Sequence, residues 1–189
     1  MPEQLENKIN QLEQLFRQHQ HNGADFSERL RGQDLQQLGK IVLASAAASI
    51  SLTIPVKQFL RILIQFGVKS GASDDYLRFN ADSGSNYTFI NSGGTARTSQ
   101  GQIDIRDGLN SALGGFMVID VLNNLSSLVK PIVIQTVNRI VAAGTAQTFY
   151  QIFGTWVNTT AFITTIGLIS SNTQTYPANS SIIVLSTKE

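Results

Sequence analysis

The sequence contains no cysteine, and this absence excludes disulfides, thiolate zinc sites and a cysteine nucleophile together. Histidine is scarce as well, because the chain has only two, His19 and His21. Proton transfer near neutral pH usually uses histidine, and the acidic residues after residue 107 are limited to Asp120 and Glu189. The sequence therefore predicts a protein that is not an enzyme.

The chain also lacks an excess of either charge and a long apolar run. Lysine and arginine number 14 against 13 aspartates and glutamates, so the net charge of +1 provides no basic field to hold nucleic acid. The apolar stretch IVLASAAASISLTIPV is interrupted by serines and a proline before the ~18 residues of a membrane span. The opening MPEQLENKIN is polar and differs from a secretory signal. We expect neither nucleic-acid binding nor membrane insertion.

Charge is distributed unevenly and divides the chain into three parts. Residues 1–40 are rich in Gln, Glu, Lys and Arg, whereas residues 140–187 contain Thr, Ser, Asn and Ile but no charged side chain. We predict an N-terminal helical attachment segment over 1–22, a polar linker over 23–40 and a β-sandwich domain over 41–189. At 189 residues the chain is long enough to bury a core without disulfides.

Short β-branched or aromatic runs, bounded by Gly, Asn, Ser or Pro, fill the third part. Eight such runs are clear, and KIVLAS and SISLTI precede them. They lie at 59–67, 76–80, 86–90, 114–122, 132–142, 148–154, 160–169 and 181–186. Their hairpin-like spacing predicts a mainly β fold, an antiparallel sandwich of jelly-roll-like type.

The first part contains a short apolar seam. Leu5, Ile9, Leu12 and Phe16 are spaced by four, three and four residues, which is the 3.5-residue repeat of a coiled coil. Only about two heptads are present, so this helix needs support from partner chains or from the body of the protein. We favour self-association along this seam, with an amphipathic helix packed on its own domain as the alternative.

Several motifs follow one another in a fixed order in the third part of the chain. An LRFN-x-D-x-G-x-NY hairpin is followed much later by a tryptophan and a T-x-x-I-T-x-I pair before a terminal strand. Here these positions are 77–80, Asp82, Gly84, Asn86, Tyr87, Trp156, Thr160 and 163–166. In this order they resemble a family of small β-sandwich proteins of tailed bacteriophages. The resemblance covers roughly residues 41–187 and implies a virion structural protein, most simply a trimeric tail-fibre or receptor-binding protein that attaches to the host surface. A capsid decoration or head-spike protein is the alternative, and a carbohydrate-binding module is the remoter one.

The two histidines form a His-x-His pair directly after the seam. Side chains two residues apart point the same way on an extended chain but not on a helix. The resemblance to trimeric phage fibres implies three such pairs around a three-fold axis, where His19 and His21 would supply six imidazole nitrogens. Six-coordination favours iron or nickel over tetrahedral zinc. No other cofactor is expected, and the alternative is a pair of solvated linker histidines.

The seam alone does not specify three chains, because Ile and Leu at its positions favour a coiled coil of two helices as readily. The homotrimer is therefore implied by the resemblance, as is docking to other virion proteins through the N-terminal segment. The host ligand, a surface carbohydrate or protein, and the residues that bind it remain unassigned. The candidates for stacking on a sugar, each equally suited to the core, are Trp156, Tyr76, Tyr87, Tyr150 and Tyr176.

Two acidic segments suggest sites only weakly. FNADSGSNY alternates polar residues like a calcium loop, but it has a single carboxylate, at Asp82, and reads as a tight turn. Asp74 and Asp75 are adjacent acids before a strand, and we expect them to lie in a solvated loop.

Overall fold

Strands account for the regular structure of the computed structural model, which describes residues 35–69, 74–91, 93–105, 114–123, 128–138, 149–171 and 174–187. Most of these strands alternate buried with more exposed side chains, as a half-buried sheet requires. They are β1 (Leu35–Val42), β2 (Ser49–Thr53), β3 (Phe59–Phe66), β4 (Asp75–Phe79), β5 (Tyr87–Asn91), β6 (Ala96–Gln100), β7 (Ile103–Asp104), β8 (Gly115–Leu122), β9 (Lys130–Asn138), β10 (Phe149–Trp156), β11 (Thr165–Ser170) and β12 (Ser181–Thr187). In the residues that the structure describes, no helix is long and apolar enough to cross a membrane.

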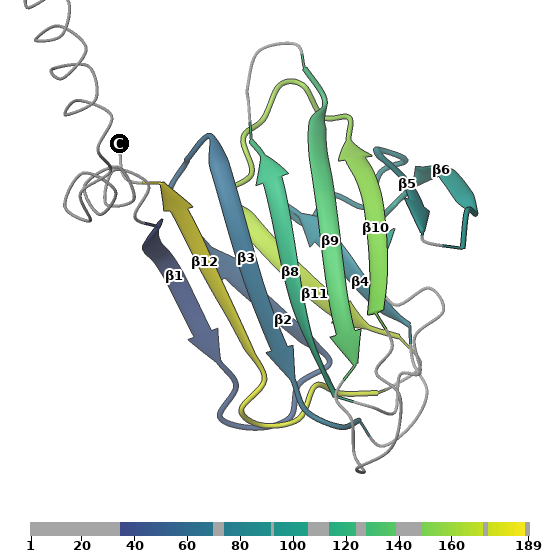
Figure 1. Ribbon diagram of the computed structural model, residues 1–189. Coiled ribbons are helices and arrows are strands. Elements are labelled where there is room, and N and C mark those ends of the chain that lie inside the picture. The colour runs from purple at the N-terminus through teal and green to yellow at the C-terminus, as the bar shows by residue number, and fades with distance from the viewer. Residues whose placement is uncertain are drawn as a thin grey trace, which may run out of the picture. The chain divides into compact units, whose positions relative to one another are not determined.

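The strands form two antiparallel sheets. The larger has eight strands in the order β1-β12-β3-β8-β9-β10-β5-β6, and the smaller has four in the order β2-β11-β4-β7. Figure 1 shows β2, β11 and β4 crossing behind the larger sheet. The prediction of a mainly β, antiparallel sandwich is confirmed.

The chain passes from one sheet to the other along most of its length. β1 and β3 belong to the larger sheet, β2 and β4 to the smaller, and the alternation returns with β7 and β8 and with β11 and β12. Two pairs interrupt it, because β5 with β6 and β9 with β10 are added side by side to the larger sheet. These four strands make the larger sheet twice as wide as the smaller.

The core lies between the two sheets and is dominated by isoleucine. Most of its members come from the inward positions of the strands, and Trp156, Tyr87 and Tyr176 are the largest. Burial of side chains of this size contributes about 1.5–3 kcal/mol each. The core therefore supplies the main stabilising contribution of the unit that spans Gln36–Thr187.

Two asparagine side chains connect strand ends to the loop before β11. The Asn80 carboxamide oxygen accepts from the backbone N–H groups of Thr164 (2.9 Å) and Thr165 (3.0 Å). The Asn123 side chain accepts from the Ile163 N–H (2.7 Å) and donates to the Lys57 carbonyl (2.9 Å). Because buried backbone groups need partners, these amides allow a non-strand segment to cross the end of the core.

The structure differs from the sequence prediction at two edges of the larger sheet. β1 begins at Leu35, inside the range predicted as a linker. The sequence also gave no signal for β6, whose residues ARTSQ are nearly all exposed. Both are terminal strands of the sheet, where pairing with one neighbour, rather than an apolar pattern, determines the strand conformation. The predicted helical segment 1–22 lies outside the described residues.

Candidate functional site

The predicted metal ligands, His19 and His21, lie outside the described residues, as do the seam residues Leu5, Ile9, Leu12 and Phe16. Within the part of the chain that the structure describes, no three His, Cys, Asp or Glu side chains are grouped so that they could hold a metal ion. The metal site and the coiled-coil seam therefore stay predictions.

The motifs that carry the phage resemblance meet at one place in the fold. Asp82, in the turn after β4, accepts hydrogen bonds from the indole N–H of Trp156 (2.7 Å) and the carboxamide of Asn86 (2.9 Å) through Oδ2. Its Oδ1 accepts from the backbone N–H of Gly84 (2.9 Å). Burial alone would raise the pKa of Asp82, but these hydrogen bonds outweigh burial and hold its pKa below the ordinary value. The segment is thus a tight turn tied to β10.

The largest aromatic residues near this turn belong to the core. Trp156 stacks on Tyr87 with ring centroids 6.4 Å apart, and Phe79 lies 5.8 Å from the Trp156 ring. Burial raises the pKa of Tyr87, whose hydroxyl accepts from the Phe79 N–H at 2.9 Å. Of the five aromatic residues considered for sugar stacking, Trp156, Tyr87 and Tyr176 are buried, and only Tyr76 and Tyr150 are partly exposed.

Two lysines are buried, which the sequence analysis did not predict. Lys69 forms an ion pair with Asp75, donates to Ser170 Oγ (2.9 Å) and lies 4.0 Å from the Tyr176 ring centroid. Asp75 is 1% exposed, so the expectation of a solvated loop is wrong at this residue; the ion pair compensates for its burial.

The second buried lysine is Lys130. It donates a hydrogen bond to the Asn158 carbonyl beside the Trp156 ring, and burial lowers its pKa.

Apolar side chains occupy many outward positions of the larger sheet, with polar ones such as Gln65, Gln135 and Gln151 among them. Neighbouring residues of a strand point to opposite faces, so the burial of Met117 in β8 and Ile152 in β10 places their neighbours outside. We name this surface the apolar face; its members are Leu63, Ile90, Phe116, Val118, Leu122, Val133, Phe149 and Phe153. The most exposed are Phe149 (57%), Phe153 (50%), Leu122 (46%) and Phe116 (45%).

Strand register places these residues side by side. Across β9, β10 and β5, Val133 is opposite Phe153, and Phe153 is opposite Ile90. On the other side of β8, Leu63 is opposite Val118. Cross-strand partners on one face lie about 4.5–5.5 Å apart. Between β8 and β9 the apolar contact runs through Val137, which is opposite both Phe116 and Phe149, whereas Val118 is opposite Gln135.

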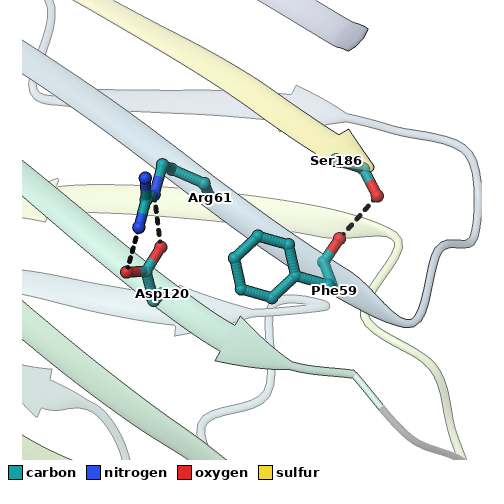
Figure 2. A network of polar contacts seen from close by, with 4 residues as sticks. All are labelled: Phe59, Arg61, Asp120 and Ser186. Atoms are coloured by element: carbon teal, nitrogen blue, oxygen red, sulfur yellow. Dashed lines mark hydrogen bonds and ion pairs between the residues drawn. The ribbon is translucent and has the colours of Figure 1, made fainter. Parts of the chain in front are cut away.

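A single ion pair lies within the apolar face. Arg61 of β3 and Asp120 of β8 are register partners, and Figure 2 shows their two parallel contacts. Arg61 Nε lies 2.7 Å from Asp120 Oδ1, and the second nitrogen, Nη2, lies 2.8 Å from Oδ2. The hydrogen bond that Arg61 donates to Asp120 is the main reason that the pKa of Arg61 is raised. Beside the pair, the Ser186 hydroxyl donates to the Phe59 carbonyl at 2.7 Å (Figure 2).

The outer face of the smaller sheet has the opposite character. Its outward positions are mainly polar or small: Ser49, Ser51, Thr53, Tyr76, Arg78, Thr165, Gly167 and Ile169. A shallow groove of about 180 Å³ crosses it, with Gly167 between its register partners Ser51 and Arg78. Arg78 Nη2 donates to Gln102 Oε1 at 2.6 Å beside this groove. The exposed lining of this groove is mainly apolar, with serine, threonine and arginine side chains along it. We name it the polar groove after these side chains, and it is the second candidate surface.

The sequence contained a signal for the apolar face. The run FMVIDVL in β8 and the run IVIQTV in β9 are nearly continuous in apolar residues, whereas the β2 run SISLT alternates. Near-continuous apolar strands are typical of sheets covered on both faces. Which strands lie side by side, and hence that the runs form one surface, required the structure.

Comparison with known proteins gives little. No protein-family model and no curated protein matches the chain. A solved structure of the infectious bursal disease virus Gx strain aligns with 80% of this chain and 40% of its own, at 14% identity and a TM-score of 0.19. The chain thus spans less than half of that viral protein's length, and a TM-score of this size does not establish a shared fold.

Proposed function

We propose that the protein is a virion structural protein of a tailed bacteriophage, a trimeric tail-fibre or receptor-binding protein that attaches to the host surface. The observation that carries this proposal is the contrast between the two outer faces of the sandwich. A sheet that faces water on one side normally alternates apolar and polar residues, as the smaller sheet does. The apolar face departs from that rule, as expected for a protein that works within an assembly.

The strand order supports a jelly roll. Without the added strands, the larger sheet reads β1-β12-β3-β8 and the smaller β2-β11-β4-β7. This is the pairing of two interleaved Greek keys in an eight-stranded jelly roll, an architecture that recurs in capsid and lectin domains. The fold is compatible with many functions, so it supports the proposal without selecting among virion components.

The N-terminal segment completes the proposed assembly. The seam Leu5, Ile9, Leu12 and Phe16 would associate three chains, and His19 and His21 from each would bind one iron or nickel ion on the three-fold axis. This segment would also dock onto other virion proteins. The sandwich is then displayed at the far end of the linker, with no catalytic role.

We assign host contact to the polar groove. Its hydroxyl groups and the Arg78 guanidinium can donate hydrogen bonds to a surface carbohydrate. A Cβ at Gly167 would meet only the Arg78 carbonyl, at 3.6 Å, so the fold tolerates a side chain there. Gly167→Val should fill the groove and reduce binding of the fluorescently labelled protein to host cells, whereas Gly167→Ala should reduce it much less. Equal binding by both variants would exclude the groove.

Immunogold labelling of intact virions tests the function itself. We expect label at the tail tip. Label on the capsid would instead select the decoration or head-spike alternative. Unlabelled particles would contradict a virion role, and a carbohydrate-binding module would then be the remaining alternative.

A further inference from the structure

We propose that the apolar face is the surface through which copies of this chain bind one another. The number of copies, three, rests on the proposed function. The location of the contact rests only on the geometry of the larger sheet.

The size of the apolar face suits a stable interface. It extends over β3, β8, β9, β10 and β5. Five strands about 4.8 Å apart and about eight residues long, at ~3.3 Å per residue, cover roughly 600 Å². Standard protein interfaces bury about 600–1,000 Å² on each partner. The area of one face is therefore at the lower end of that range.

The charges of the apolar face also permit burial. Arg61 and Asp120 are its ionic pair, and their two hydrogen bonds satisfy each other within one chain. The costly case is the burial of an unpaired charge. Because Arg61 and Asp120 are paired with each other, their burial in an interface leaves no unpaired charge. The net charge of +1 adds only weak repulsion between copies.

A copy of the same chain fits this surface better than a different partner. The ion pair offers no net charge to a charged partner. The other polar side chains of this face, such as Gln65, Gln135 and Gln151, are uncharged, so recognition depends mainly on apolar area. Each copy brings an apolar face of equal size, so faces turned toward a common axis would cover Phe116, Phe149 and Phe153 on every copy. The seam at 5–16 predicts self-association from an independent part of the sequence.

The experiment measures the mass of the full chain by native mass spectrometry and light scattering across a dilution series. The wild type should be a trimer at micromolar concentration. Phe153→Asp should raise the dissociation constant at least about 30-fold, because a central aromatic residue is a typical hot spot. Val56→Asp is the matched control: Val56 is 44% exposed in the loop between β2 and β3, and its replacement should leave the mass unchanged.

Two further measurements keep the outcome decisive. Circular dichroism checks that each variant is folded, and Phe153→Thr, which keeps a β-branched residue in the strand, replaces the aspartate variant if that one unfolds. Oxidative footprinting of the wild type should show Phe116, Phe149 and Phe153 protected in the assembled state and labelled after dilution.

The outcomes separate this inference from the proposed function. A monomeric wild type, or a trimer that folded Phe153 variants leave intact, would overturn the assignment of the apolar face. A wild-type dimer that Phe153→Asp dissociates would support the apolar face and contradict the trimer. If immunogold label lies at the tail tip but the copies contact one another through a different surface, the proposed function stands and the apolar face is rejected.

Discussion

At the scale of single residues, Asp82 connects two distant parts of the sequence. Its carboxylate holds the turn after β4 through Gly84 and Asn86, and it holds β10 through Trp156. The resemblance motif had marked both segments without explaining why they occur together. The hydrogen bond between them gives the reason, since the turn positions the acceptor and the buried indole needs one.

Removing this carboxylate should destabilise the sandwich. Asp82→Ala leaves the Trp156 N–H without its acceptor and removes two further hydrogen bonds of the turn. A hydrogen bond to a charged group contributes about 1.5–3 kcal/mol, so we expect the free energy of unfolding to fall by roughly 2–4 kcal/mol. Urea titration followed by Trp156 fluorescence measures it. A loss no larger than that of Ser83→Ala, an exposed neighbour in the same turn, would contradict this role.

The same carboxylate predicts a pH dependence. Its folded-state pKa lies below the ordinary value of 3.8, so its contribution to stability is complete above pH 3.8 and is lost as the pH falls through the lower folded-state pKa. We expect Asp82→Asn to make the free energy of unfolding fall less steeply with acid below about pH 4. Parallel acid titrations of the two proteins would refute this if their slopes were the same.

The buried ion pair gives a second prediction at this scale. Asp75→Ala leaves the Lys69 ammonium buried without its carboxylate, which costs about 3–5 kcal/mol. Lys69→Met combined with Asp75→Val removes both charges and should recover most of that loss. Chemical denaturation of the single and double variants forms the test. If the double variant lost as much free energy of unfolding as the two single variants together, the two side chains would not depend on each other.

At the scale of elements, close backbone approach fixes where side chains are tolerated. Gly114 precedes β8, and a Cβ there would lie 2.7 Å from the Phe66 carbonyl oxygen and 2.9 Å from the Gly67 carbonyl carbon. Backbone atoms cannot move aside as a flexible side chain can. At Gly167 in β11 the corresponding Cβ is in ordinary contact, at 3.6 Å.

Because of this contrast, replacement by alanine should change the free energy of unfolding differently at Gly114 and at Gly167. Gly114→Ala should lower the free energy of unfolding by about 1–3 kcal/mol, as overpacking does. Gly167→Ala should leave it unchanged or raise it by up to ~1 kcal/mol through the unfolded state. Thermal melting of both variants measures the difference. Equal melting temperatures would mean that the β3–β8 end is not closely packed.

At the scale of the whole molecule, the sandwich has one outer face rich in apolar side chains and one that is mainly polar. The added strands β9, β10 and β5 carry Val133, Phe153 and Ile90, and so enlarge the apolar face. The smaller sheet stays narrow and polar. In the proposed trimer, the wide face provides the contact and the narrow face remains available to a host ligand.

The metal prediction belongs to this scale because it needs three chains. Protein made without a histidine tag should contain about one iron or nickel ion per trimer, and the combined His19→Ala and His21→Ala change should remove it. Acid should release the ion as the imidazoles protonate. Elemental analysis with thermal melting provides the measurement. A metal-free trimer that melts like the double variant would identify both histidines as solvated linker residues.

The sequence by itself determined the mainly β, antiparallel sandwich, because period-two apolar runs and turn residues are local signals. Even there it missed β6 and the start of β1, whose strand conformation depends on pairing at a sheet edge. It also marked the turn at Asp82, since Asp, Ser, Gly and Asn favour turns locally.

Only the tertiary structure decided which surface the apolar strands form. The contact of β8 with β3 and β9, and of β10 with β5, joins residues as far apart as Tyr87 and Trp156, and no local pattern encodes that order. The burial of Lys69, Asp75 and Lys130 is of the same kind, because a charged side chain enters the core only where distant partners meet it. Register and strand order, which depend on the whole chain, therefore determine both candidate surfaces.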